Sequence, residues 1–371
     1  MIIKPRDVMP ATAFTLPARY YTNPAFFQRE LDELFGRMWF CAGRSQDAAA
    51  PGQYFVREMN GRNIVITRNA HGGIKAFHNI CRHRGTRLCA EREGQLPGSI
   101  QCPYHAWTYD LDGRLIGAPH MDDVPHFHRS DYPLLGVHAA EWDGHIFLNL
   151  AGDAEPLAAQ LGPLVDRFRS WRMPDLRRGH RIVYDLKANW KLIIQNYNEC
   201  LHCPNLHPAL NRLSHYLSGE NEPLHATYMG GLMDLQPGVE TLSMDGSCRR
   251  AILPGLSPED ARRVYYYCLF PNLMLSLHPD YMLTHTLWPI APDRTVNVCE
   301  WHFQPEELAR PDFDASDCIE FWDMTNKQDW QVCELSQAGI SSPAYVPGPY
   351  SNREDLLYAF DRWIVDLHQG N

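Results

Sequence analysis

The chain has 371 residues, of which 44% are hydrophobic and 21% are charged, and its formal net charge is −10. This composition is that of a globular protein with a sizeable core, and the length predicts about two domains. The acidic balance argues against general binding to nucleic acid or to anionic membranes, because both require concentrated Lys and Arg. With neither a signal-like N-terminus nor a long apolar run, we expect a cytoplasmic protein.

The first half of the sequence predicts a helix followed by a small β domain. Apolar residues recur at nearly the helical period over residues 24–41, and Asn23 is suited to cap that helix. Between residues 53 and 150, short strand-like runs alternate with turn signals such as Asn60-Gly61 and Asp112-Gly113. We therefore expect a helical segment over residues 1–42 that packs on the C-terminal domain, and an antiparallel β domain over residues 43–155.

The second half predicts a larger domain over residues 156–371. A helical stretch at 157–171 is followed by a strand at 182–186. Strand-like runs at 264–277, 282–288 and 296–303 predict an antiparallel meander, and the pattern at 315–338 predicts a long closing helix. The expected fold class is α+β.

Two short motifs in the β domain supply four candidate metal ligands. Cys81 and His83 form a Cys-x-His pair, and Cys102 and His105 form a Cys-x-x-His pair. Tetrahedral zinc also uses two Cys and two His, so the alternatives are a zinc ribbon or four unrelated residues. In a Rieske [2Fe-2S] centre, two Cys hold one iron and two His hold the other, which suits two loops that each offer both ligand types.

A second constellation lies at residues 189–208. His202 and His207 are five residues apart, with Glu199 three residues before the first. On an ideal helix the two imidazoles would diverge by about 140°, but Pro204 interrupts helical regularity between them. Two His and one carboxylate form the facial triad of non-haem Fe(II) oxygenases.

The third ligand is expected on the predicted helix at 315–338. Asp329 shares a helical stripe with apolar or neutral neighbours, whereas Asp323 has Lys327 four residues later as an ordinary surface partner. We therefore favour Asp329 as the iron ligand. Cys200 and Cys203 have a spacing found in zinc sites and redox pairs, but no second Cys pair accompanies them. The eleven cysteines as a whole predict free thiols and metal ligands rather than disulfides.

These segments resemble a known family. Cys-Arg-His-Arg-Gly at 81–85 and Cys-Pro-Tyr-His-Ala-Trp at 102–107 resemble the Rieske motif of ring-hydroxylating oxygenase α subunits, and residues 328–337 resemble the segment with the metal Asp in these enzymes. The resemblance covers residues 25–340 or so. It implies an N-terminal Rieske domain on a helix-grip catalytic domain, with a [2Fe-2S] cluster, a mononuclear Fe(II) and O2 as co-substrate. Glu334 and Gln337 are expected either to support the iron ligands or to have a structural role.

The resemblance also implies partners. The family forms homotrimers in which electrons cross a subunit interface, and Glu199 stands where a carboxylate bridges His202 and His105 of the partner subunit. No Gly-x-Gly-x-x-Gly fingerprint for a nucleotide cofactor occurs. We therefore expect a separate NAD(P)H-dependent flavin and iron–sulfur reductase, acting directly or through a ferredoxin.

The nature of the bridge residue favours one class of substrate. Many aromatic-ring dioxygenases of the family have Asp there, whereas Glu199 is similar to enzymes that oxidise carnitine, choline and betaines. We expect a betaine-like substrate, hydroxylated next to nitrogen and then demethylated. The alternatives are hydroxylation or cis-dihydroxylation of an aromatic acid and, in another class, an electron-transfer Rieske protein without turnover. Candidates for aromatic faces that bind the cation are Tyr228, Tyr266, Tyr281 and Trp288. Gln195 stands where Glu is usual, which removes a local charge.

Overall fold

The structure is a computed structural model that describes residues 9–369, and the chain separates into two compact units. One unit runs from Leu34 to Gly162, and the other combines the residues up to Glu33 with those from Pro163 onward. No helix of the described residues is both long and apolar enough to cross a bilayer.

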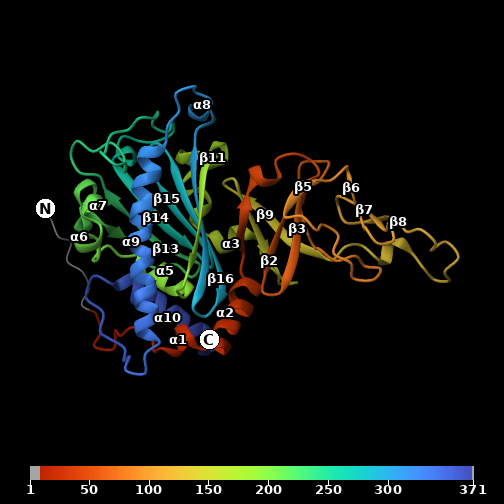
Figure 1. Cartoon of the computed structure of the whole chain (residues 1–371), viewed down its shortest axis with the longest axis horizontal. Coiled ribbons are helices and arrows are strands. Elements are labelled where there is room, and N and C mark those ends of the chain that lie inside the picture. Colours follow the sequence, from red (N-terminus) through yellow and green to blue (C-terminus); the bar gives the residue numbers. More distant parts are fainter. Residues whose placement is uncertain (1–8, 370–371) are drawn as a thin grey trace. The chain divides into compact units, whose positions relative to one another are not determined.

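The unit 34–162 is built from antiparallel strands (Figure 1). A seven-stranded sheet has the order β1-β10-β9-β4-β3-β2-β5, and a three-stranded sheet has the order β6-β7-β8. At the β2–β3 turn, Asn60 and Gly61 both have positive φ, as the predicted hairpin requires. The elements are β1 (Phe40–Arg44), β2 (Gln53–Met59), β3 (Arg62–Arg68), β4 (Ile74–His78), β5 (Glu93–Gln95), β6 (Ser99–Gln101), β7 (Thr108–Asp110), β8 (Leu115–Gly117), β9 (Gly136–Trp142), β10 (His145–Asn149) and α3 (Leu157–Leu161).

The second unit contains a seven-stranded antiparallel sheet of order β11-β17-β16-β15-β14-β13-β12, with the long helix α9 across one face (Figure 1). Its strands are β11 (Arg177–Leu186), β12 (Glu220–Asn221), β13 (Tyr228–Asp234), β14 (Arg263–Leu269), β15 (Leu273–Leu277), β16 (Met282–Ala291) and β17 (Arg294–Phe303). Its helices are α1 (Arg19–Thr22), α2 (Pro24–Glu30), α4 (Leu164–Arg167), α5 (Trp190–Tyr197), α6 (Cys203–Leu206), α7 (Pro208–Leu213), α8 (Pro305–Leu308), α9 (Ser316–Ile340) and α10 (Asp355–Gln369).

Two predicted elements have different limits in the structure. The helix predicted at 24–41 is α2 followed by a π-helical turn at Leu31–Phe35, and the chain enters β1 at Phe40. Pairing of β1 with β10 therefore outweighs the helical periodicity of the last residues. The run 264–277 is two strands, because Pro271 in the turn between β14 and β15 has no amide hydrogen for a sheet ladder.

The position of α5 is fixed by buried polar contacts, and this helix leads directly into the segment with Glu199. Asn189 caps α5 by accepting a hydrogen bond from the amide of Lys191. The Lys191 ammonium lies 2.7 Å from Glu30 of α2, and both side chains are almost fully buried. His368 of α10 also contacts Glu30, at 3.2 Å. Glu30 therefore links α2 to both α5 and α10. Separating these helices would leave a buried charge without its partner, which is costly.

Candidate metal centres and active-site pocket

The two Cys/His loops of the β unit have the same backbone frame. In each loop the amide of the Cys donates to the carbonyl of the residue five positions later. The amide of the residue four positions later, Gly85 or Ala106, donates back to the carbonyl of Cys81 or Cys102. Gly85 and Ala106 both have positive φ, 74° and 55°. That conformation is unfavourable for Ala, so the second loop is held in it by its surroundings.

The side chains of these loops converge as a cluster site requires. Both thiols are buried, and the imidazole rings of His83 and His105 lie 4.8 Å apart, with His83 stacked on Trp107. Among the described residues, Nδ1 of His105 is a buried polar atom without a hydrogen-bond partner. A buried unpaired nitrogen is rare in native proteins, and a metal ligand needs such a free lone pair. The four residues therefore fit the Rieske cluster.

One residue beside the cluster site was not identified from the sequence. The phenol of Tyr109, on β7, lies 3.5 Å from Sγ of Cys81 and accepts a hydrogen bond from the amide of Arg82. Its side chain is fully buried. A hydrogen bond to a cluster sulfur raises the reduction potential. The only sequence signal was its place two residues after Trp107 in the second motif.

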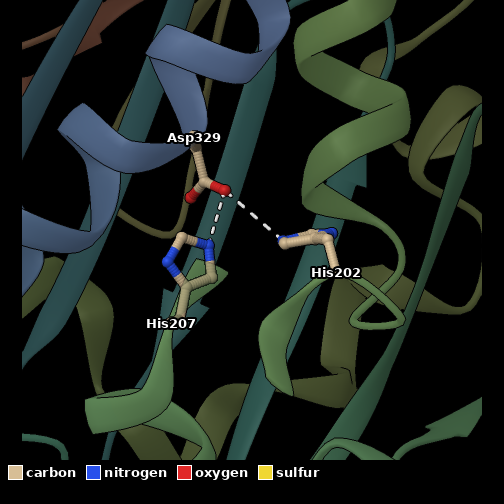
Figure 2. Close-up of side chains that lie close together, drawn as sticks. All are labelled: His202, His207 and Asp329. Carbon is tan, nitrogen blue, oxygen red and sulfur yellow. Dashed lines mark hydrogen bonds and ion pairs between the residues drawn. The ribbon is translucent and has the colours of Figure 1, made fainter. Parts of the chain in front are cut away.

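The three residues of the predicted iron triad meet in the second unit (Figure 2). One oxygen of Asp329, from α9, lies 2.7 Å from Nε2 of His207 and 3.4 Å from Nε2 of His202. Potential ligand atoms of all three lie within 4.8 Å of one another. Pro204 lies in α6, between the two histidines, which places His202 before the helix and His207 after it. Asp323 instead pairs with Lys327, as the sequence predicted.

Each histidine is oriented by an acceptor on its other nitrogen. Nδ1 of His202 lies 2.5 Å from Glu199, which also accepts a hydrogen bond from the amide of Leu201. Nδ1 of His207 lies 2.7 Å from Oε1 of Gln328. A carboxylate or amide oxygen only accepts, so each Nδ1 is the protonated nitrogen and each Nε2 is left to bind metal. Gln328 was missed in the sequence, although it directly precedes Asp329.

The electrostatics of the triad call for a cation. Burial alone would lower the pKa of His202, but hydrogen bonds to Asp329 and Glu199 outweigh it and raise the pKa to about 10. Burial would raise the pKa of Asp329, and its contacts with His202 and His207 instead lower that pKa. The carboxylates thus stabilise positive charge between the two imidazoles. A divalent metal supplies that charge in place of the protons.

A pocket with a volume of about 120 Å³ lies beside the triad. By this measure a single water needs roughly 10–15 Å³, so the pocket has room for a small organic ligand. Aromatic side chains from α5, β14, β16 and α9 form much of its wall: Tyr197, Tyr266, His285, Trp322 and Trp330. Tyr266 packs edge-on to both Tyr197 and Trp322, at 5.9 and 6.4 Å.

Of the four aromatic residues that the sequence suggested for cation binding, one lines the pocket. Tyr266 lines the pocket, but Tyr228, Tyr281 and Trp288 are not among the described residues that line it. Tyr281 is a core residue whose hydroxyl bonds the carbonyl of Leu242. Trp322 precedes Asp329 by seven residues on the same stripe of α9, and it does line the pocket.

Several other expected residues have structural partners. The Glu334 carboxylate accepts a hydrogen bond from the amide of Lys187, and the Gln337 side chain accepts one from the amide of Asn189. Both residues thus fix the start of α5 rather than contact the histidines. Cys200 and Cys203 form a disulfide, the pairing that the sequence disfavoured. Their spacing alone could not show that the turn before α6 brings the two sulfurs together.

Gln195 also has a local explanation. Its amide nitrogen donates to Asp361 of α10 at 2.6 Å, and the hydroxyl of Tyr21 lies 3.0 Å away. Tyr350 donates to the other oxygen of Asp361. A glutamate at position 195 would place its carboxylate against the buried carboxylate of Asp361. The neutral amide of Gln195 avoids that repulsion and donates a hydrogen bond to Asp361 instead.

The two metal sites and the sheet-and-helix fold define a Rieske-type non-haem iron oxygenase. A model of the Rieske [2Fe-2S] domain matches residues 38–128, and one of the ring-hydroxylating α-subunit catalytic domain matches residues 173–370. The chain belongs to the ring-hydroxylating α-subunit family. Its fold class and its cofactors, a Rieske cluster and non-haem iron that uses O2, are confirmed, and its activity requires an electron-donating partner and a small-molecule substrate.

Curated relatives match nearly the whole chain. The glycine betaine monooxygenase oxygenase subunit of Chromohalobacter salexigens is 30% identical over 95% of this chain and 85% of that protein. The carnitine monooxygenase oxygenase subunit of Escherichia coli is 28% identical over 91% of this chain and 87% of that protein. The solved structure of the quaternary ammonium Rieske monooxygenase CntA with L-carnitine has a TM-score of 0.78 and 26% identity, covering 98% of this chain and all of the other. Naphthalene 1,2-dioxygenase from Rhodococcus sp., at 20% identity and a TM-score of 0.72, covers 95% of this chain and 94% of that chain and shares the fold.

Proposed function

We propose that the two clustered sets of side chains hold the two metal groups. The cluster ligands are Cys81, His83, Cys102 and His105, and the iron ligands are His202, His207 and Asp329. Support comes from the unpaired Nδ1 of His105 and from the two imidazoles that converge on one carboxylate. Three protein ligands on iron leave positions open for O2 and substrate.

The reaction we propose is oxidation of a carbon next to the nitrogen of a betaine-like quaternary ammonium compound. In net terms, an N-methyl group, O2, two electrons and two protons give an N-hydroxymethyl group and water. The N-hydroxymethyl group then breaks down to formaldehyde, a tertiary amine and a proton. The iron supplies O2 activation when bound, and the protein excludes bulk water and holds the reacting carbon beside it.

One observation supports this substrate class above others: the pocket wall beside the triad is aromatic. The ring of Tyr266 packs edge-on against those of Tyr197 and Trp322, and all three line the pocket. A quaternary ammonium group cannot donate a hydrogen bond, so ring faces are its natural partners, at about 0.5–2 kcal/mol for each contact. The relatives with betaine and carnitine substrates agree with this choice.

Glu199 is proposed as the bridge for electrons. It contacts Nδ1 of His202 at 2.5 Å and is partly exposed, so a neighbouring subunit can reach its carboxylate. In the β unit both cysteines are buried while His83 is exposed, so the cluster presents its histidine side outward. We propose a homotrimer in which Glu199 meets His105 of the partner subunit. A solved structure of the quaternary ammonium monooxygenase is described as showing inter-subunit electron transfer.

The electron donor we propose is a separate NAD(P)H-dependent flavin and iron–sulfur reductase, and the proposed compartment is the cytoplasm. The test of the substrate class is turnover in air by the anaerobically loaded enzyme with such a reductase. It is followed by aldehyde release for the quaternary ammonium compounds and by O2 consumption and product analysis for the aromatic acid. The panel consists of glycine betaine, L-carnitine, γ-butyrobetaine and choline, with benzoate as the aromatic acid. Turnover of at least one quaternary ammonium compound supports the proposal. Turnover of benzoate alone contradicts it.

A further inference from the structure

The disulfide between Cys200 and Cys203 lies at the proposed iron site, but the reaction described above does not use it. It is the one disulfide among the described residues, and the other nine cysteines there are not paired with one another. Disulfides are rare in the cytoplasm, and those that occur there are usually transient and have a catalytic or sensing role. In the proposed compartment, a purely structural role is therefore the less common explanation for this pair.

The disulfide connects the residues that surround the proposed iron. It closes a loop that contains His202, and Cys200 directly follows Glu199 in the chain. The carbonyl of Cys203 accepts a hydrogen bond from the amide of His207 at 2.8 Å. One S–S bond therefore ties the proposed electron bridge to the segment with both iron histidines.

The pair is accessible from the pocket and is positioned by the main chain. Both cysteines line the pocket beside the triad, and Cys200 is partly exposed whereas Cys203 is 2% exposed. The amide of Cys203 donates to the carbonyl of Cys200 at 3.1 Å, and the two Cα atoms lie 5.0 Å apart. At that separation a disulfide forms without movement of the backbone. The turn itself thus places the two sulfurs, so the pair can form again after it has been opened.

We propose that Cys200 and Cys203 are a reversible dithiol–disulfide pair, and that the disulfide form is the one that passes electrons efficiently through Glu199. This inference rests on the proposed function, because it concerns the proposed bridge and an iron ligand. In the disulfide form, a covalently closed turn holds Glu199 against His202 at 2.5 Å. In the dithiol form the turn loses its covalent restraint, so the contact on which the bridge depends is less well ordered.

The reductant that fits this site is a thiol compound or a dithiol protein. A thiolate of the reductant attacks Sγ of the more exposed Cys200, and the sulfur of Cys203 leaves and takes up a proton. A second thiol of the reductant then displaces Cys200, so the reductant becomes a disulfide and the pair gains two electrons and two protons. Hydrogen peroxide is the matching oxidant, because two thiols and one peroxide give the disulfide and two waters.

The test equilibrates the loaded wild-type enzyme anaerobically with mixtures of reduced and oxidised glutathione. Alkylation with mass spectrometry gives the fraction of the pair in the dithiol form. Stopped-flow gives the rate at which O2 reoxidises the reduced cluster, in the presence of the quaternary ammonium compound that the enzyme turns over. We expect Cys200 and Cys203 to titrate together as a two-electron couple. The dithiol form should reoxidise the cluster roughly 3- to 10-fold more slowly, because the contact that supports His202 is loosened rather than removed, and the faster rate should return when the disulfide is restored.

The Cys200→Ser, Cys203→Ser double variant should show the slow rate in every mixture. Cys248→Ser is the matched control, because Cys248 is a partly exposed free thiol that is not among the described pocket-lining residues. Its rate should respond to glutathione as the wild type does. A pair that stays fully oxidised or fully reduced in all mixtures, or equal rates for its two forms, would overturn the inference while the proposed function stands. A loaded wild type that oxidises no quaternary ammonium compound would instead refute the proposed function and, with it, this inference.

Discussion

The role of Gln328 leads to a sharp prediction about iron affinity. Its Oε1 lies 2.7 Å from Nδ1 of His207 and accepts the proton on that nitrogen. Gln328→Leu removes the acceptor, so His207 loses the hydrogen bond that keeps Nε2 free for metal. Loss of such a supporting contact commonly costs 10- to 100-fold in metal affinity. At about 1.4 kcal/mol for each factor of ten, the expected cost is roughly 1.4–2.7 kcal/mol.

The assay is anaerobic titration of metal-free protein with Fe(II) in competition with a chromogenic chelator. Gln328→Glu serves as the rescue variant, because a carboxylate accepts the same hydrogen bond and should hold iron at least as tightly as the wild type. Gln331→Leu is the matched control, since Gln331 is an exposed residue of the same helix. Wild-type iron affinity in Gln328→Leu would show that the hydrogen bond does not orient His207, and the reasoning would fail.

Four further predictions follow from other contacts. Gln195→Glu should cost on the order of 2–3 kcal/mol in urea unfolding at pH 8, because it places a carboxylate against Asp361. Burial raises the pKa of Asp361 to about 7, so its stabilising contribution is complete below the unfolded pKa near 4 and is lost as pH rises through about 7. Asp361→Asn should therefore flatten the decline in stability between pH 5 and pH 8, and an unchanged slope would contradict that pKa. Tyr109→Phe removes the hydroxyl beside Cys81. A hydrogen bond of about 1 kcal/mol corresponds to roughly 40 mV for one electron, so redox titration should show a cluster potential that is lower by that amount. An equal or higher potential would contradict the role of Tyr109. Glu199→Gln should retain both metal groups but slow reoxidation of the reduced cluster at least about tenfold in stopped-flow, and wild-type kinetics would exclude a bridge.

Much of the metal chemistry could be predicted from sequence because its motifs are local. Cys81 with His83, Cys102 with His105, and His202 with His207 each lie within a few residues, so their spacing restricts the geometry. Asp329 lies more than a hundred residues from the histidines. It was distinguished from Asp323 by its position on a predicted amphipathic stripe, by the Lys327 partner of Asp323 and by the family resemblance of residues 328–337. The structure brings it to both imidazoles.

The parts that could not be predicted depend on contacts between distant segments. Arg353 lines the pocket from the turn before α10, a helix with no recognised signal in the sequence, and Asp361 on that helix explains Gln195. All four aromatic candidates were placed by composition and location in the predicted sheet alone, which does not say which face of the sheet the helix α9 covers, and three of them are not among the described residues that line the pocket. Pairing across β1 and β10 likewise ended a helix whose periodicity continued.

The central claim is that one chain holds a Rieske cluster and a separate mononuclear iron. Iron and acid-labile sulfide are measured on anaerobically purified wild type and on the His202→Ala, Asp329→Ala double variant, with EPR after dithionite reduction. We expect about three irons and two sulfides per wild-type chain and a Rieske signal, with one iron lost and the signal kept in the variant. Zinc in place of iron, or no labile sulfide, would contradict it.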